Sequence, residues 1–193
     1  GRLALPDLSM GEAHPMLKDG PAALPIARFG RFVAATDEKY LLVYDVLKME
    51  LAWKTPLLNV DLSKDMKMRI AVNEKYVTLI KEDYDRKAIY CFNMENGAIL
   101  WNTDPVNSGS LQPIYSMVLE GDVLYGIGEH PGQGFYFVAY DCVKGVVKYR
   151  KLLEGYSSIP VVRLRSQIYD KHLIAELMDR KDFQLIVLDK TSG

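Results

Sequence analysis

The side chains that could act as nucleophiles or metal ligands are few and far apart in the sequence. There are two cysteines, Cys91 and Cys142, and three histidines, His14, His130 and His172. None of them stands at the Cys-x-x-Cys or His-x-x-x-His spacing that brings ligands together on one metal ion. We therefore interpret the cysteines as buried thiols and the histidines as isolated polar residues, and we predict no catalytic residue and no metal site.

Other segments with suitable residue types lack the setting that their chemistry needs. The segment "KEDYDRK" (81–87) is acidic but does not have the calcium-loop pattern of alternating oxygen ligands, so we predict a solvated hairpin tip. The segment "GEHPGQG" (128–134) is rich in glycine but lies between two apolar runs, whereas a phosphate-binding loop is followed by a helix. No serine stands in a Gly-x-Ser-x-Gly setting. We therefore predict no cofactor-binding residue and no cofactor.

The composition narrows the class of protein. Of the 193 residues, 49% are hydrophobic and 25% are charged, which is the balance of a globular protein with a substantial core. The formal net charge of -1 gives no basic surface for nucleic acid. There is no apolar run of about eighteen residues, so we predict no transmembrane segment. The chain starts Gly1-Arg2-Leu3 without a signal-peptide core, so either a leader has been removed or this is a piece of a longer chain.

A repeat of 48 residues organises the whole chain. An apolar run ends at an Asp or Asn, a glycine follows four residues later, and an aromatic residue follows four residues after that. The first position is Asp45, Asn93, Asp141 and Asp189; the second is Gly97, Gly145 and Gly193, with Met49 breaking the pattern; the third is Trp53, Trp101 and Tyr149. A fixed period of this length is the signature of a repeat architecture.

Each repeat contains further short runs rich in β-branched and aromatic residues, which predict strands. They are residues 31–36, 75–80, 122–128 and 171–177, preceded by 68–72, 114–119 and 161–168. Four strands in 48 residues, without a helical period, predict an all-β fold, a β-propeller built from four-stranded antiparallel blades.

The repeated residues have physical roles in such a blade. The Asp or Asn can accept hydrogen bonds from the backbone N–H groups of the turn that it opens. Glycine permits a positive φ where the chain reverses. The aromatic residue offers a large flat surface to bury between neighbouring blades, which contributes about 2–3 kcal/mol. We therefore interpret Trp53 and Trp101 as packing residues rather than as a ligand platform.

At these residues the sequence resembles the PQQ-type repeat of quinoprotein β-propellers, whose pattern is roughly Ala-x-Asp-x-x-Thr-Gly-x-x-x-Trp. The segment "CFNMENGAILW" (91–101) fits its length, "VYDVLKMELAW" (43–53) lacks the glycine, and "AYDCVKGVVKY" (139–149) ends in tyrosine. The resemblance implies radial blades, often seven or eight, and an extracytoplasmic location, periplasmic or secreted.

Some members of this family are quinone-dependent dehydrogenases with a vicinal cysteine pair and a calcium ion beside the quinone. Here Cys91 and Cys142 lie in different repeats, and no set of acidic and amide side chains matches the calcium ligands. The resemblance is therefore specific for architecture and not for activity. Part of a PQQ-dependent oxidoreductase, or of another propeller enzyme, stays as the alternative function.

We predict one propeller domain over residues 1–193, with repeats at about 1–48, 49–96, 97–144 and 145–193. Two arrangements are open. The chain forms an arc of a larger seven- or eight-bladed ring, or Arg2–Leu5 supplies the closing outer strand of a four-bladed ring.

The function that we predict is a non-catalytic scaffold or recognition domain that binds a protein or small ligand through one face. The linkers between blades share one face of a propeller, and here they are residues 6–25, 55–67, 102–113 and 152–160. Long variable loops on a rigid frame are where binding residues usually lie. The candidates near the channel mouth are Tyr115, Tyr156, Arg163 and Arg165. The two arginines share one face of a strand by period two, so they contact either an anion or a neighbouring blade.

Overall fold

The computed structural model describes residues 26–36, 39–57, 67–82, 87–103, 114–130, 134–153, 163–178 and 183–192. These residues contain fifteen β-strands and no helix, and the strands form four antiparallel sheets.

The strands of each sheet follow one another in space as they do in the sequence. The first sheet consists of β1 (Ile26–Phe29), β2 (Phe32–Thr36), β3 (Tyr40–Asp45) and β4 (Glu50–Pro56). The second consists of β5 (Lys67–Val72), β6 (Tyr76–Glu82), β7 (Lys87–Asn93) and β8 (Ile99–Asn102). The third consists of β9 (Ile114–Glu120), β10 (Val123–His130), β11 (Gly134–Asp141) and β12 (Val146–Leu152). The last consists of β13 (Arg163–Tyr169), β14 (His172–Met178) and β15 (Phe183–Asp189).

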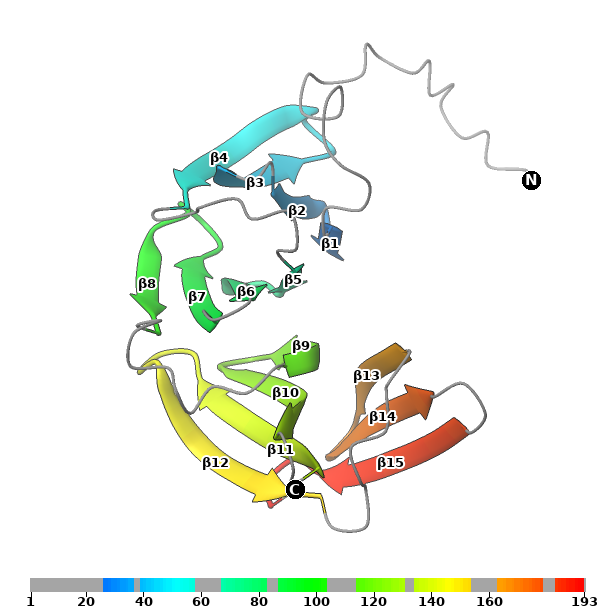
Figure 1. Ribbon diagram of the computed structural model, residues 1–193. Coiled ribbons are helices and arrows are strands. Elements are labelled where there is room, and N and C mark those ends of the chain that lie inside the picture. Colours follow the sequence, from blue (N-terminus) through cyan, green and yellow to red (C-terminus); the bar gives the residue numbers. More distant parts are fainter. Residues whose placement is uncertain are drawn as a thin grey trace, which may run out of the picture.

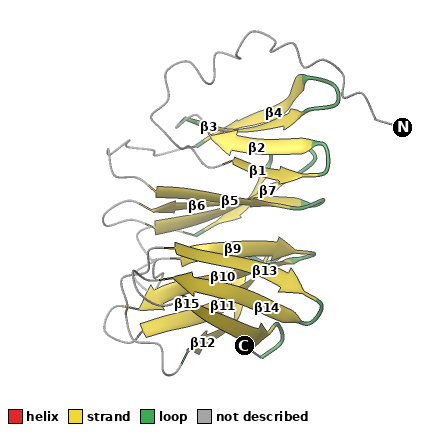
Figure 2. Cartoon of the chain, turned by 90° about the vertical axis from the view of Figure 1, so that its right-hand side faces the viewer, coloured by secondary structure: helices red, strands yellow, loops and turns green. Residues whose placement is uncertain are grey.

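The four sheets are arranged like blades around a common centre (Figure 1). The innermost strands β1, β5, β9 and β13 neighbour one another in this order, and the outer strands β4, β8 and β12 lie on the outside. The described turns lie on one face of the stack (Figure 2). The prediction of an all-β propeller with four-stranded antiparallel blades is confirmed. The sheets do not close a four-bladed ring; they form an open arc.

Apolar residues fill each gap between sheets, and in the first three sheets the third strand is covered on both faces. In β11, every residue from Phe135 to Tyr140 is buried, whereas in the outer strand β12 all residues except Tyr149 are exposed. Three apolar clusters result, one in each gap. This explains why the third strands are continuous apolar runs in the sequence and the outer strands are mixed.

The closing aromatic residues Trp53, Trp101 and Tyr149 each reach the next sheet. The indole Nε1 of Trp53 donates a hydrogen bond to the carbonyl of Met94 (2.8 Å), and that of Trp101 donates to the carbonyl of Cys142 (2.6 Å). The Tyr149 hydroxyl donates to the carbonyl of Lys190. In all three sheets a β-bulge of the third and fourth strands adjoins the aromatic residue, and such bulges re-aim side chains. The repeat therefore fastens each blade to the next through one aromatic ring.

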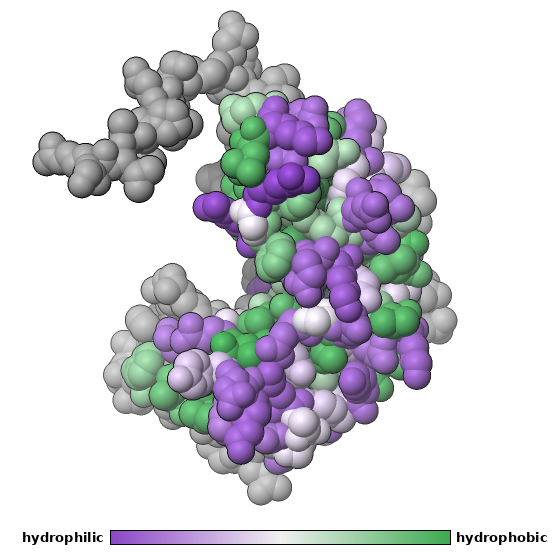
Figure 3. Space-filling view, turned by 180° about the vertical axis from the view of Figure 1, so that it is seen from behind, coloured by the Kyte–Doolittle hydropathy of each residue, from purple (hydrophilic) through white to green (hydrophobic). Residues whose placement is uncertain are grey.

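The last sheet leaves one of its faces exposed. Phe183, Leu185 and Val187 on β15 are 62%, 55% and 56% exposed. The residues at the same repeat positions in β11 are 0% exposed, because they pack in the cluster that the last sheet covers. Figure 3 shows the arc from behind, hollowed between its first and last sheets.

The turn after β3 ends in a methionine at the position where the turns after β7 and β11 have a glycine. Met49 stands at the position of Gly97 and Gly145, and all three residues have positive φ, of 56°, 72° and 71°. A left-handed conformation costs a residue with a Cβ about 1–2 kcal/mol, and Met49 is 81% exposed, so no packing offsets this cost.

We expect Met49→Gly to raise the free energy of unfolding by roughly 0.5–1 kcal/mol, because the relieved strain exceeds the greater chain entropy of glycine. Urea unfolding measures the change. In the matched control Lys48→Gly, the neighbouring residue has no positive φ, so only the entropic cost applies and stability should fall. A loss of stability in Met49→Gly would contradict the prediction.

Candidate functional site

Each outer turn is stabilised by hydrogen bonds to the Asp or Asn side chain that precedes it. Oδ1 of Asp45 accepts hydrogen bonds from the backbone N–H groups of Leu47 (3.1 Å) and Lys48 (3.3 Å). Asp141 and Asp189 accept equivalent pairs from the residues two and three positions later, and Asn93 accepts one from Glu95. The Thr191 hydroxyl, with the backbone amides, lowers the pKa of Asp189 to about 2. These side chains are engaged in turn formation. The lowered pKa of Asp189 keeps its carboxylate ionised at neutral pH, so Asp189 is not a general acid there.

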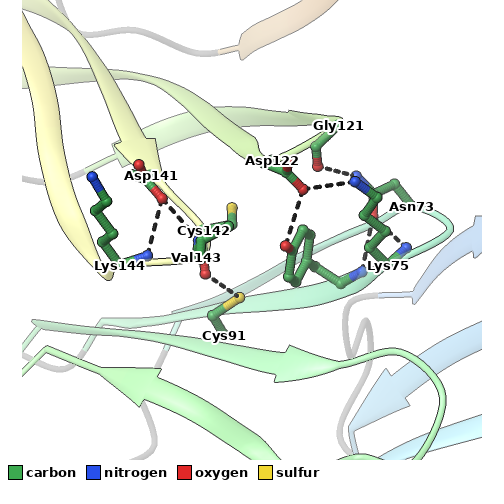
Figure 4. A network of polar contacts seen from close by, with 10 residues as sticks. Asn73, Lys75, Cys91, Gly121, Asp122, Asp141, Cys142, Val143 and Lys144 are labelled. Atoms are coloured by element: carbon green, nitrogen blue, oxygen red, sulfur yellow. Dashed lines mark hydrogen bonds and ion pairs between the residues drawn. The ribbon is translucent and has the colours of Figure 1, made fainter.

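A polar network joins the inner turns of the second and third sheets (Figure 4). Asn73 is buried; its Nδ2 donates to the carbonyl of Gly121 (2.9 Å), and its Oδ1 accepts from the backbone N–H groups of Lys75 and Tyr76 (2.9 Å each). Asp122 Oδ1 lies 3.0 Å from both Lys75 Nζ and the Tyr76 hydroxyl oxygen. The network therefore connects two blades at the face where the described turns lie.

Two groups of this network, Asp122 and Tyr76, have shifted pKa values. Hydrogen bonds from Lys75 and then Tyr76 lower the pKa of Asp122. Burial, followed by the hydrogen bond to Asp122, raises the pKa of Tyr76 to about 12. Neither group changes its protonation near pH 7, so the network favours a structural role over proton transfer.

The two cysteines lie in one apolar cluster although 50 residues separate them in the sequence. Cys91 Sγ lies 3.9 Å from the carbonyl oxygen of Cys142, which also accepts the Trp101 indole hydrogen bond. The neighbouring Cys142 thiol and burial raise the pKa of the Cys91 thiol. Cys91 therefore stays a protonated thiol between the second and third blades, and a thiol of this kind is a poor nucleophile.

The candidates for partner contact occupy innermost strands. Tyr115 is the second residue of β9, and Arg163 and Arg165 lie at the start of β13, the neighbouring innermost strand. Arg165 pairs in register with Glu176 on β14. The fourth candidate, Tyr156, lies outside the described residues. So do the predicted linkers, except for a few residues at their ends. The three described positions are at the strand ends remote from the turns at Gly121 and Asp170, so their backbone lies towards the face opposite the described turns. We call this opposite side the partner face.

No metal or membrane-spanning element is found among the described residues. They contain no group of three or more His, Cys, Asp and Glu side chains that could hold a metal ion. They also contain no helix long and apolar enough to cross a membrane.

Sequence reasoning missed the network around Asn73 and Asp122. A signal for it was present, because Asn73 and Gly121 stand 48 residues apart and so occupy equivalent turns. Equivalence alone does not show that one turn bonds to the other, since that depends on the distance between neighbouring blades.

By fold, the chain is part of a β-propeller, and comparison with solved structures shows which ones it is similar to. BamB from Moraxella catarrhalis matches with a TM-score of 0.53 and 17% identity, over 88% of this chain and 49% of that chain. Apo AztD from Citrobacter koseri matches with a TM-score of 0.59 and 15% identity, over 89% and 45%. A second structure of Citrobacter koseri AztD matches with a TM-score of 0.58 and 16% identity, over 90% and 45%.

At these identities the likeness shows the fold alone. The chain spans about half the length of the structures that it matches. No family model matches the sequence, and neither does any curated protein.

Proposed function

We propose that this chain is a non-catalytic part of a β-propeller that recognises a protein or a small ligand through the partner face. The observation that carries the proposal is the placement of Tyr115, Arg163 and Arg165 on two adjacent innermost strands, at the ends that lead to this face. An aromatic residue and two arginines are residue types that dominate recognition sites. The PQQ-like character of the repeat and an extracytoplasmic location belong to the same proposal.

The chemistry of the described polar groups supports recognition rather than catalysis. The turn carboxylates accept hydrogen bonds from backbone amides, the Cys91 thiol is protonated, and Asp122 is held by Lys75 and Tyr76. Each group has a partner that explains it structurally. What these contacts produce is a stiff frame, which is the usual support for binding loops.

The test is substitution on the partner face. A partner is first captured on the immobilised chain and identified by mass spectrometry, and its affinity is then measured by surface plasmon resonance. Charge and alanine substitutions in residues 104–112 and 154–158 should weaken binding by about tenfold or more, as expected when residues at the centre of an interface are lost. Thermal stability should change little, because in the sequence these residues lie between the repeated strands and outside the apolar runs that form the core.

The matched controls are substitutions at the opposite face, at Leu47–Lys48 and Glu95–Asn96, which lie in the outer turns of the first two sheets. These variants should bind the partner as the unmodified chain does. If they lose binding while the variants in 104–112 and 154–158 keep it, the partner face has been assigned to the wrong side of the propeller.

A further inference from the structure

The outer strand of the third sheet, β12, combines exposed apolar side chains with positive charge. The segment Cys142–Leu153 has four basic residues and no acidic one, in a chain whose net charge is -1. Val146, Val147 and Leu152 are 51%, 48% and 42% exposed. The basic residues Lys144, Lys148, Arg150 and Lys151 are exposed as well.

Two acidic residues near this strand, Asp141 and Asp122, already have other contacts. Asp141 accepts hydrogen bonds from the backbone N–H groups of Val143 and Lys144 (2.9 Å each). Asp122 is held by Lys75 and Tyr76, although the charge of Lys148 also acts on it. Within the described part of the chain, neither Lys144 nor Lys148 forms an ion pair. The strand therefore keeps an excess of positive charge.

Of the described outer edges, β12 is the long one without proline. An edge strand exposes unpaired N–H and C=O groups, and proteins guard such edges with short strands, proline, β-bulges or charged side chains, especially lysine. The lysines of β12 therefore disfavour pairing with a basic strand, but they attract an acidic one. The strand β4 ends at Pro56 and carries Glu50, which pairs with Lys48 (3.3 Å), and β8 has only four residues. In contrast, β12 is the edge of its sheet, has seven residues and contains neither proline nor glycine.

We propose that β12 is a docking edge for an acidic, extended segment of a partner protein, which adds to the third sheet as a fifth antiparallel strand. In such strand addition, main-chain hydrogen bonds to the edge supply affinity and alternate side chains supply specificity. Carboxylates of the added segment would lie near the positive charges of Lys144 and Lys148, and its apolar residues, which share one face, would cover one of the two exposed valines, Val146 or Val147. This surface lies on the rim of the propeller, so it is separate from the partner face and does not depend on the function proposed for it.

The geometry is tested with a short capped peptide in which glutamate and valine alternate, binding being followed by fluorescence anisotropy at low ionic strength. We expect this peptide to bind and to slow amide hydrogen exchange in residues 146–152. A peptide with lysine in place of glutamate should not bind. An acidic peptide of the same charge with a central proline, which cannot form the ladder, should bind at least about tenfold more weakly.

Substitutions locate the site. The double variant Lys144→Glu/Lys148→Glu should weaken binding of the alternating peptide by at least about tenfold, because two attractive charges become repulsive. Lys54→Glu is the matched control on β4, where the side chain lies over the Tyr40 ring (5.2 Å), and it should leave binding unchanged. Three results would each overturn the proposal: no binding, equal binding of the proline peptide, or unchanged exchange of the β12 amides on binding. If the variants in residues 104–112 lost peptide binding, the peptide would be binding at the partner face and not at β12.

Discussion

Gly97→Ala should destabilise the chain by about 3–5 kcal/mol, the range seen when a large core side chain loses its packing. Gly97 has a φ of 72°, and a Cβ on it would lie 2.4 Å from Cε3 and 2.6 Å from Cδ2 of Trp53. The ring would have to move, and its hydrogen bond to the carbonyl of Met94 would be lost with it. Gly145→Ala should behave alike, because its Cβ would lie 2.7 Å from Cγ of Trp101. Urea unfolding followed by circular dichroism measures both losses.

Gly30 and Gly121 provide the matched controls. They also have positive φ, of 55° and 52°, but a Cβ on either meets nothing within 4 Å. Gly30→Ala and Gly121→Ala should therefore cost only the backbone strain, about 1–2 kcal/mol. Similar losses in all four variants would mean that contact with the closing aromatic residue contributes nothing. A further check is that Gly145→Ala should cost less in a Trp101→Ala background, since the clash is then absent.

The blade architecture was predictable because the repeat appears in residue types that have one physical use. Asp45, Asn93 and Asp141 open turns, and Gly97 and Gly145 stand where φ is positive. An aromatic residue eight positions after the Asp or Asn predicts packing between blades. The sequence could not show which group the ring contacts, because the carbonyls of Met94 and Cys142 belong to the next repeat and become neighbours only when the sheets stack.

The first strand, β1, was not predicted. The turn at Gly30 precedes the equivalent turn at Gly121 by 91 residues, five fewer than two repeats, because β2 and β3 are shorter than β10 and β11. The segment Ile26–Phe29 therefore falls outside the expected spacing. It has only four residues, one of them an arginine, so it shows no clear period of two.

The candidate site was less predictable than the fold. Repeat spacing placed Tyr115, Arg163 and Arg165 on innermost strands, because those strands recur at a fixed distance before each motif. Their contribution to binding stays a prediction. The network around Asp122 depends on distances between neighbouring sheets, which a single sequence does not encode in any local pattern. The basic residues of β12 are visible in the sequence, but its place at the edge of a sheet follows only from the strand order.

Raising the pH from about 9 to 12 should remove stability through the buried tyrosines. Burial raises the pKa of Tyr140 to about 12, although the charge of Arg150 opposes this shift. In the unfolded chain a tyrosine ionises near pH 10. Between these values the folded chain holds a proton that the unfolded chain has lost. The contribution is therefore complete below about pH 10, declines as the pH rises, and is lost above about pH 12. For Tyr140, which is 4% exposed, the loss is about 2–3 kcal/mol.

The measurement is the free energy of unfolding in urea at a series of alkaline pH values, with ultraviolet absorbance reporting phenolate formation. In Tyr140→Phe the decline between pH 9 and 12 should be smaller by about 2–3 kcal/mol, because one group that titrates in this window is absent. Tyr76→Phe serves as a contrast. It also removes a phenol with a pKa of about 12, but it breaks the hydrogen bond to Asp122, so it should lower stability at neutral pH as well. If the curve of Tyr140→Phe ran parallel to that of the unmodified chain, the alkaline loss would have to come from other groups, and burial of this ring would not control it.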